Sequence, residues 1–427
     1  MGVDILLTKH LFGDLNIDSK DLIGIYGPRR IEKPGLSDED IAECIRAPIG
    51  TAPLGDLVRG KQKILIVTDD NTRLTPLSRL LPPILSEIEK ASIKKDNITI
   101  LIGLGTHRPM SKVEIRTKFG AEISGSHRIV NHSWNDPGSL VSLGVSDLGY
   151  EIVINRLTQE ADFIMSVGTI VPHATTGFSG GGKTVMPGIC GARTIEETHW
   201  TALNYSISEL LGNFNNRVRD TIVNICRKIN LDFIVNTVLL SEGSIYGLVA
   251  GDVEDAHRLG SEMCRSIYGI AIPEKADIVV AEAYPTDIDL RQAIKAICAC
   301  DLVCKDRGVV ILVADCREGV APQFPNFSRY GFSDPEQVYN DVETGKFREK
   351  LLAYTLVAIG RIISKRVRAI LVCPNIDREV TERLGFLWSS DLSTAWDMAR
   401  KITASAARTI VLKEAGELLP LLSKSFI

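Results

Sequence analysis

Apolar and polar residues form two recurring patterns along the chain, which predict alternating strands and helices. Short continuous apolar runs indicate buried strands, whereas apolar residues spaced three and four positions apart indicate a helix with one buried side. The helical pattern is clearest after Pro76, where leucines and isoleucines recur as far as Ile88. Strands alternating with helices predict mostly parallel sheets flanked by helices. The predicted strands cover residues 63–68, 97–103, 161–167, 277–281, 308–314, 368–373 and 409–412.

The strand pattern divides the chain into two predicted α/β domains. A new series of strands begins just after Pro273, with no long linker or low-complexity segment before it. We therefore expect an N-terminal domain of residues 1–272 and a C-terminal domain of residues 273–427, each large enough to bury its own core.

Composition excludes several classes of function. The net charge is −4 and no run of basic residues occurs, so no nucleic-acid partner is expected. No apolar run approaches the roughly 18–20 residues of a membrane helix, and the N-terminus lacks a signal-peptide pattern. The nine cysteines are odd in number and scattered, as is typical of reduced thiols. These features predict a cytoplasmic protein with no membrane partner.

Three cysteines lie close enough in sequence to suggest a site for a soft metal, namely Cys298, Cys300 and Cys304. However, the segment from Gln292 to Cys304 has the pattern of a single helix. Residues two positions apart on a helix point in different directions, so Cys298 and Cys300 would not face a shared ion. Packing in the core is the better interpretation of this group.

The segment from Pro172 to Trp200 carries the densest set of small and reactive residues in the chain. Gly177 to Thr184 spells the phosphate-loop pattern G-x-x-x-x-G-K-[ST], which would make the protein a nucleotide triphosphatase. That loop requires a strand leading directly into the first glycine and a helix beginning at the lysine. Here the predicted strand ends well before Gly177, and Pro187 interrupts any helix that begins at Lys183. The triphosphatase therefore stays an alternative, and a glycine-rich turn near an anion is the more general prediction.

Acidic, histidine and lysine side chains gather near the ends of predicted strands. Asp70, His107 and His173 follow strands directly or after one short loop, and in a parallel sheet such positions share one edge. Histidine is the usual acid or base near neutral pH and a common metal ligand, and lysine can bind a cofactor covalently. Lys183 and His199 therefore extend the candidate site. For each histidine taken alone, a packing role is an equal or better explanation.

Cationic and amide side chains form a second candidate group. Arg73 can bind a carboxylate or phosphate through two hydrogen bonds, although a surface arginine beside a helix-capping network is the alternative. A helix predicted to begin near Asp289 carries Arg291, and Gln292 and Lys295 are neighbours on its next turn. A cationic helix start suits anion binding, and a solvated helix face is the competing explanation.

In order and spacing these segments resemble the nickel-dependent lactate racemase family over most of the chain. The resemblance implies an isomerase, a racemase or epimerase that inverts C2 of a 2-hydroxyacid. It also implies an active site in the cleft between the domains, with cofactor binding and catalysis in the N-terminal domain and substrate closure in the C-terminal domain. The matching segments are Asp70–Arg73, Gly105–Pro109, Pro172–His173, Gly177–Lys183, Met186–Gly188, His199 and Arg291–Lys295.

The resemblance implies a nickel cofactor, in which a pyridinium-3,5-bisthiocarboxylic acid mononucleotide grips the metal through sulfur-containing arms. Lys183 matches the lysine that tethers the nucleotide, and His199 matches the protein ligand of the nickel. A planar, sulfur-rich ligand set suits Ni(II). The proteins that make this cofactor are implied partners, beside the hydroxyacid substrate. The other residues expected to lie against the cofactor are Asp70, Gly177, Ser179, Gly180 and Gly181.

The implied reaction is reversible hydride transfer between substrate and cofactor, with His107 and His173 as the acid/base pair. One histidine removes the hydroxyl proton while the C2 hydride leaves, and a planar 2-keto acid forms. The keto acid reorients, the hydride returns to its other face, and the second histidine protonates the oxygen, so two bases are required. The residues expected to hold the substrate are Arg73, Ser86, Arg291, Gln292, Lys295 and Tyr354.

Two positions depart from the family pattern. The lactate enzymes of the family carry tyrosine where this chain has Arg291, and tryptophan near the place of Tyr354. Because both positions border the substrate, the added cation suggests an acid larger or more polar than lactate, such as malate or an aldonic acid like gluconate. A relative that binds a hydroxyacid without converting it is a further alternative.

Overall fold

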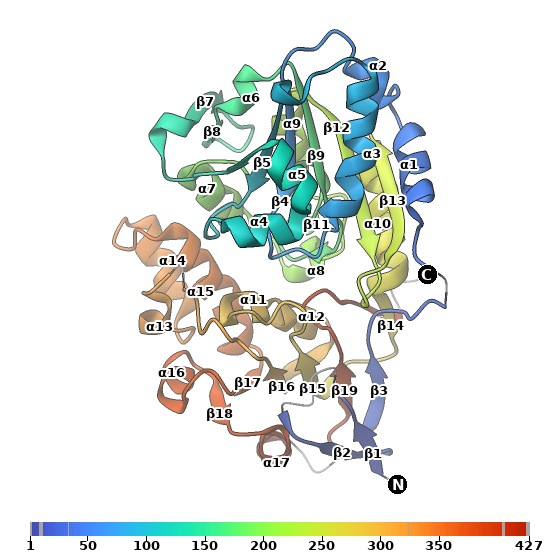
Figure 1. The fold of residues 1–427 in the computed structure, drawn as a ribbon. Helices are drawn as coiled ribbons and strands as arrows, with labels where there is room; N and C mark the ends of the chain where they lie inside the picture. The colour runs from blue at the N-terminus through green and yellow to red at the C-terminus, as the bar shows by residue number, and fades with distance from the viewer. Residues whose placement is uncertain (1, 8–11, 33, 323, 404–405, 424–427) are drawn as a thin grey trace. The chain divides into compact units, whose positions relative to one another are not determined.

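The computed structural model describes residues 2–7, 12–32, 34–322, 324–403 and 406–423. Its elements form two compact units (Figure 1). Unit 1 comprises Met1–Arg29, Leu203–Leu211 and Ile267–Ile427, and unit 2 comprises Arg30–Ala202 and Gly212–Ser266. Each unit contains a six-stranded, mostly parallel sheet flanked by helices, which confirms the predicted fold class.

The sheet of unit 2 contains the first three strands predicted from the sequence as its central members. The strand order is β13-β12-β9-β4-β5-β6, and only the β12–β13 pair is antiparallel. Every residue of β9 is buried, as the continuous apolar run predicts for a strand covered on both faces. The bounds are β4 (Ile64–Asp69), β5 (Ile98–Gly103), β6 (Arg128–Asn131), β9 (Phe163–Thr169), β12 (Leu231–Leu239) and β13 (Ile245–Gly251).

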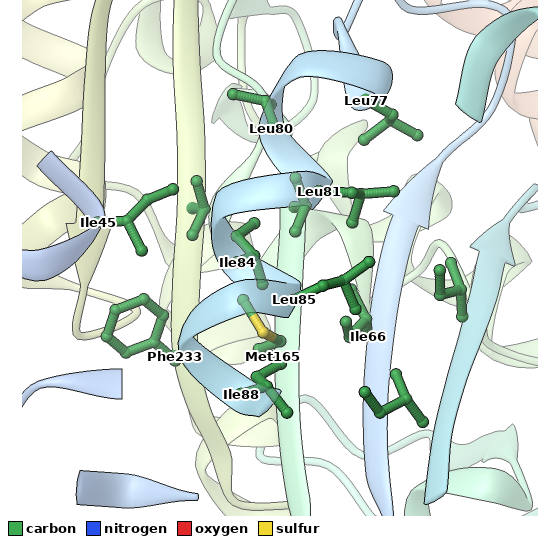
Figure 2. Close-up of a cluster of buried hydrophobic side chains, with 14 of the residues drawn as sticks. Ile45, Ile66, Leu77, Leu80, Leu81, Ile84, Leu85, Ile88, Met165 and Phe233 are labelled. Atoms are coloured by element: carbon green, nitrogen blue, oxygen red, sulfur yellow. The ribbon is translucent and has the colours of Figure 1, made fainter. Parts of the chain in front are cut away.

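One face of this sheet is covered by helices from the first part of unit 2. The longest of them, α3 (Leu77–Lys90), buries the leucines and isoleucines that define its apolar side. Figure 2 shows these side chains packed against Ile66, Met165 and Phe233 of the strands, with Ile45 beside them. The other helices here are α1 (Asp38–Arg46), α2 (Leu54–Leu57), α4 (Lys112–Phe119) and α5 (Ala121–Ser126).

The remaining elements of unit 2 include a short 3₁₀ helix that carries the candidate lysine. This helix, η4 (Gly181–Thr184), contacts β4, β9, β12 and the helix α9 (Arg217–Lys228). Two small antiparallel hairpins precede it, β7 (Leu140–Val145) with β8 (Glu151–Asn155), and β10 (Pro172–His173) with β11 (Gly177–Phe178). The unit is completed by α6 (Leu157–Glu160), α7 (Ala192–Ala202) and most of α10 (Asp255–Tyr268).

The sheet of unit 1 is parallel throughout, in the order β18-β17-β16-β15-β19-β3. The helix α17 (Leu392–Ile402) and the hairpin of β1 (Gly2–Ile5) with β2 (Leu15–Asp18) pack on it through one apolar cluster. The helix α12 (Lys295–Val303) packs on β15 and β16. The sheet strands are β3 (Leu22–Tyr26), β15 (Ala276–Glu282), β16 (Cys304–Val313), β17 (Arg368–Val372), β18 (Leu387–Ser389) and β19 (Thr409–Leu412).

The remaining helices and one further strand pair complete unit 1. The parallel pair of β14 (Gly269–Ile272) and β20 (Leu419–Leu422) lies apart from the main sheet. The helices not yet named are α8 (Ile207–Leu210), α11 (Leu290–Ala293), α13 (Phe327–Tyr330), α14 (Pro335–Glu343), α15 (Lys350–Ile363) and α16 (Arg378–Arg383).

The grouping of the chain differs from the predicted domains of residues 1–272 and 273–427 mainly at the N-terminus. Met1–Arg29 belongs to unit 1 because β3 is the edge strand beside β19. A pattern of apolar residues predicts a strand but does not predict which sheet the strand joins.

The segment from Gln292 to Cys304, predicted as a single helix, instead forms parts of two helices, α11 and α12. Cys304 is the first residue of β16. Cys298 and Cys300 are buried, as the core interpretation predicts. Within the described part of the chain, no group of three or more potential metal-binding side chains is found.

None of the nine cysteines forms a disulfide, which agrees with reduced thiols. Among the described residues, no helix has both the length and the apolar character that crossing a membrane requires.

Candidate active site

The ends of two neighbouring strands bring Asp70 and His107 together in unit 2. Asp70 directly follows β4, and His107 lies in the turn after β5, which pairs with β4 along its whole length. His107 Nδ1 lies 2.7 Å from Asp70 Oδ2. Because a carboxylate only accepts, Nδ1 carries the hydrogen, and Nε2 of the neutral ring presents a lone pair. His107 is thus oriented as a base.

The Asp70 carboxylate is ionised and firmly held. It is 2% exposed, and its Oδ1 accepts hydrogen bonds from the Thr72 amide at 3.0 Å and the Thr72 hydroxyl at 2.6 Å. Burial raises the pKa of Asp70, but the positive charge that His107 carries when protonated, and the hydrogen bonds from His107 and Thr72, outweigh burial and hold this pKa well below its usual value. Asp70 therefore remains an acceptor that fixes the ring of His107.

His173 has the opposite arrangement of ring nitrogens. It ends β10 and faces Gly177 across the small hairpin. The Thr175 amide donates to His173 Nδ1 at 3.2 Å, so Nδ1 must accept and the neutral ring carries its hydrogen on Nε2. One predicted base thus offers a lone pair at Nε2, and the other offers a hydrogen.

The glycine-rich turn packs tightly against other parts of unit 2. Gly177, Gly180 and Gly181 have positive φ angles of 80°, 73° and 54°. A Cβ at Gly177 would lie 2.0 Å from the Asn213 carbonyl oxygen, and one at Gly181 would lie 2.8 Å from the ring of His257. At these two positions the contact that requires glycine is with the protein itself, whereas the family resemblance implies that the same glycines lie against a cofactor.

Hydrogen bonds complete the support of this turn. The Gly181 amide donates to Asn236 Oδ1 at 2.7 Å, and His257 Nε2 donates to the Ser179 carbonyl oxygen at 2.7 Å. The Ser179 hydroxyl donates to the Thr169 carbonyl oxygen at 2.8 Å and accepts from the Val171 amide at 2.9 Å. The Ser179 side chain, predicted to contact the cofactor, thus ties the turn to the end of β9.

Lys183 lies in η4 at the end of this turn, with its side chain partly buried. Loss of solvent, together with the positive charge of Arg73, lowers the pKa of the Lys183 ammonium to about 7, although the Asp70 charge acts in the other direction. About half of the amines are then neutral near pH 7, and the neutral amine is the nucleophile. The residue is therefore suited to covalent attachment of a carboxyl-derived group.

His199 lies in α7, and its ring is oriented by its own helix. His199 Nδ1 lies 2.7 Å from the Ile195 carbonyl oxygen, one turn earlier, so Nδ1 is the donor and Nε2 keeps its lone pair. Histidines that bind metals commonly donate their other ring hydrogen to a carbonyl group in this way. The arrangement fits a single histidine ligand.

Two further predicted residues of unit 2 have different surroundings. Arg73 follows Asp70 in the same loop, where its Nη1 donates to the Thr72 carbonyl oxygen at 3.2 Å. Ser86 is exposed on the outer side of α3, about 14 Å along the helix from its start beside the strand ends. The structure thus places Arg73 with the other residues and does not bring Ser86 to them.

The phosphate-loop interpretation of Gly177–Thr184 is not supported by the geometry. Gly177 lies in the strand β11 of a hairpin, and Lys183 lies in a 3₁₀ helix of four residues. The next α-helix, α7, begins at Ala192. A strand–loop–helix arrangement at the lysine, which phosphate binding requires, is therefore lacking.

Three of the predicted substrate residues of unit 1 lie close together in the chain, Arg291 and Gln292 in α11 and Lys295 as the first residue of α12, whereas Tyr354 lies in α15. Asp289 caps this helix by accepting from the Gln292 amide at 2.7 Å, and Lys295 Nζ donates to Gln292 Oε1. The guanidinium carbon of Arg291 lies 4.8 Å from the ring centroid of Phe324, and Arg291 Nε is buried without a hydrogen-bond partner. Burial lowers the pKa of Arg291, against the charges of Asp289 and Tyr354.

Sequence reasoning missed two groups that support these residues. The Thr175 amide, which sets the ring of His173, has no side-chain signal. Glu114 contacts both strand-end loops, and the only sequence signal near it is the Ser111-x-x-Glu114 capping box. That motif predicts where α4 begins and says nothing of contacts with distant loops.

Two family models match the chain. The lactate racemase N-terminal domain matches residues 10–210, and the lactate racemase C-terminal domain matches residues 272–417. A lactate racemase from Thermoanaerobacterium thermosaccharolyticum is 31% identical over 392 residues, which is 90% of each chain. A lactate racemase from Lactiplantibacillus plantarum is 30% identical over 384 residues, 89% of this chain and 90% of that protein.

Solved structures show the same relationship. The lactate racemase apoprotein from T. thermosaccharolyticum superposes with a TM-score of 0.87 at 30% identity, covering 99% of this chain and 100% of that one. A crystal structure of a Thermotoga maritima protein superposes with a TM-score of 0.72 at 21% identity, covering 92% and 100% of the two chains. The second similarity concerns the fold alone.

Proposed function

Because the chain belongs to the lactate racemase family and is an isomerase, we propose that it inverts C2 of a 2-hydroxyacid by the acid/base action of His107 and His173. The hydrogen bond between Asp70 and His107 carries the proposal. It holds one imidazole as an oriented base in the same unit as Lys183 and His199. Two of the relatives are named lactate racemase, so lactate is the first substrate to test.

His107 accepts the hydroxyl proton at Nε2. The imidazolium that forms is stabilised by the Asp70 carboxylate, which stays ionised because its pKa is held well below its usual value. His173 presents Nε2–H, which can donate a hydrogen bond to the substrate oxygen. To act as a base, His173 must move its hydrogen to Nδ1, and the bond from the Thr175 amide must then be released. The two histidines are therefore unequal bases.

The residues of unit 2 fit the nickel pincer nucleotide that the family resemblance implies. Lys183 offers an amine that is substantially neutral near pH 7, and His199 offers Nε2 as a ligand for nickel. When bound, this cofactor supplies an acceptor for the C2 hydrogen. Arg73 and, separately, the Gln292–Lys295 pair are each proposed as groups that bind a carboxylate. Proteins that make the cofactor, and a cytoplasmic location, belong to the same proposal.

The surroundings of Arg291 support a substrate beyond lactate. Its guanidinium stacks near Phe324, and its Nε has no hydrogen-bond partner although it is buried. A buried donor without a partner is costly, and a polar group of a ligand would satisfy it. Malate and gluconate are therefore proposed as substrates to test beside lactate.

The test is inversion by protein loaded with cofactor, through coexpression with the proteins that make it. Each enantiomer of lactate and malate, and gluconate, is followed by chiral chromatography. His107→Gln is expected to lower kcat by roughly 10²- to 10⁴-fold, without a change in Tm. His127→Gln, beside Ser126 on another part of unit 2, is the matched control.

The outcomes distinguish the alternatives. Loaded protein that inverts none of these acids, or a fully active His107→Gln variant, contradicts the proposal. Binding of a hydroxyacid without conversion would indicate a binding protein. Magnesium-dependent hydrolysis of ATP would return the triphosphatase to consideration.

A further inference from the structure

Helix α4 contributes little to the apolar core, although it lies beside the site loops. Of its eight residues, only Phe119 is buried. Its polar side chains instead contact the loop that follows β4. Lys118 Nζ donates to the Arg73 carbonyl oxygen at 2.8 Å and lies 3.4 Å from Asp69 Oδ1. The helix therefore holds this loop from outside.

Glu114 is the centre of these polar contacts. Its Oε1 accepts from Asn71 Nδ2 at 2.9 Å and Arg108 Nη2 at 2.7 Å. Its Oε2 accepts from Arg108 Nη1 at 2.9 Å and the Ser111 amide at 2.8 Å. Four donors thus occupy the roughly four lone-pair sites of one carboxylate. The hydrogen bonds of Arg108 and Ser111 lower the pKa of Glu114 to about 2, so the group is ionised at neutral pH.

Two of these hydrogen-bond partners, Asn71 and Arg108, are chain neighbours of the residues proposed to act in catalysis. Asn71 follows Asp70, and Arg108 follows His107. A capping box needs only the contact with Ser111. The contacts of Glu114 with Asn71 and Arg108 instead join the loop after β4 to the turn after β5, and the Asp70–His107 hydrogen bond spans the same two segments.

We propose that Glu114 is a positioning residue for His107: by bridging Asn71 and Arg108 it fixes the separation of the two segments that carry the Asp70–His107 pair. Those tests of this proposal that measure turnover rest on the proposed function. Displacing a catalytic group by about 1 Å can lower the rate by up to about 100-fold. Partly exposed ion pairs contribute little to stability. Loss of Glu114 should therefore affect catalysis far more than folding.

The experiment compares Glu114→Ala with Asp40→Ala in the full chain. Asp40 completes the capping box of α1 with Ser37 in the same unit, so both variants remove a capping carboxylate, but only Glu114 bridges the site loops. We expect Glu114→Ala to lower kcat roughly 10- to 100-fold with little change in KM, and Asp40→Ala to leave both within twofold. Both should lower Tm by a similar amount.

Variants that remove only one of these contacts distinguish the role of Glu114 in joining the two loops from its role in capping α4. Asn71→Ala and Arg108→Ala each remove one side of the bridge and leave the Ser111 contact in place, so each should lower kcat less than Glu114→Ala does. Adding Asn71→Ala to Glu114→Ala should have no further effect, because the contact is already lost. Glu114→Gln keeps one oxygen and should recover part of the activity. If Glu114→Ala does not fold, Asn71→Ala and Glu114→Gln carry the test.

A second readout needs neither substrate nor cofactor. Nitrogen NMR of ¹⁵N-histidine-labelled apoprotein reports which ring nitrogen of His107 is protonated, with the signal assigned by its loss in His107→Gln. We expect a single Nδ1–H form in the wild type and in Asp40→Ala, and a broadened mixture of forms in Glu114→Ala. An unchanged His107 signal with unchanged kcat in Glu114→Ala would overturn the proposal. Absence of inversion by wild-type protein would count against the proposed function, and the NMR comparison would still test positioning.

Discussion

The strand-end loops and the glycine-rich turn of unit 2 hold their functional residues by different physical means. In the loops, hydrogen bonds between charged or polar groups hold the side chains in place, as in the Asp70–His107 pair and the Glu114 bridge. In the turn, Gly181 is required because its neighbours leave no room for a side chain, and Lys183 is carried by that packed backbone. The loops should therefore be sensitive to changes of charge, and the turn to changes of volume.

The sharpest test of volume compares two glycines with nearly the same backbone angle. Gly181 has φ of 54° and Gly105 has φ of 55°, but only the Cβ of an alanine at Gly181 would meet another residue, the ring of His257. Gly105→Ala should cost about 1 kcal/mol from backbone strain. Gly181→Ala should cost about 3 kcal/mol, because overpacking adds to the strain. Urea unfolding of both variants measures the difference.

Equal losses of stability in these two variants would contradict this account of the turn. They would mean that the backbone angle alone selects glycine at both positions, and that the turn has room to adjust around His257. If the account is right, the His257→Ala substitution removes the ring that a Cβ at position 181 would meet. In that background, Gly181→Ala should lower the free energy of unfolding by less than it does in the wild type.

A smaller effect is expected from the charge of Lys183 within the packed turn. Its pKa is about 7 in the folded protein, against roughly 10.4 in an unfolded chain, so between these pH values the unfolded state binds more protons. Stability due to this group therefore rises with pH across that window. Lys183→Met should be more stable than the wild-type apoprotein by about 2 kcal/mol at pH 6, because partial exposure of the side chain reduces the larger free energy that the pKa difference alone would give. This difference in stability should fade by about pH 10.

Urea unfolding at several pH values checks this prediction, and the cofactor supplies its control. A lysine joined to the cofactor no longer titrates, so loaded wild-type protein should lose this pH dependence. A constant difference between wild type and Lys183→Met at every pH would show that the ammonium is not desolvated.

The smallest expected effect concerns Ser86, which lies outside both supporting systems. Ser86→Ala should leave kcat/KM within twofold and stability within about 0.5 kcal/mol, because the side chain is exposed on the outer side of α3. Inversion kinetics and urea unfolding measure both quantities. A rise in KM of tenfold or more would restore the substrate role expected for Ser86 from the family resemblance.

The fold could be predicted where apolar runs are long and continuous. The runs at 63–68, 97–103 and 161–167 correspond to β4, β5 and β9, because strands buried on both faces leave a strong signal. The edge strand β3 could not be assigned, since its residues are only partly buried and its partner β19 lies near the other end of the chain. Which strands pair is decided by packing between distant segments.

The candidate site divides in a similar way. The proximity of Asp70 and His107 could be predicted from the sequence, because both follow neighbouring strands. Backbone donors such as the Thr175 amide could not, because any residue supplies an amide and only the turn directs it at His173. Ser86 differs, because its substrate role is expected from a family position alone and its side chain is exposed on α3, away from the strand ends.

The parallel pairing of β3 with β19 has a consequence for the order in which the protein folds. Leu22 lies opposite Thr409, so 387 residues separate the partners (409 − 22). At a synthesis rate of about 5–20 residues per second, β3 leaves the ribosome roughly 20 to 80 s before its partner exists. Unit 2 is made entirely within that interval and can fold during it. Since β19 is the neighbour of β3 in the described sheet, β3 must stay available without a sheet partner until β19 has been synthesised.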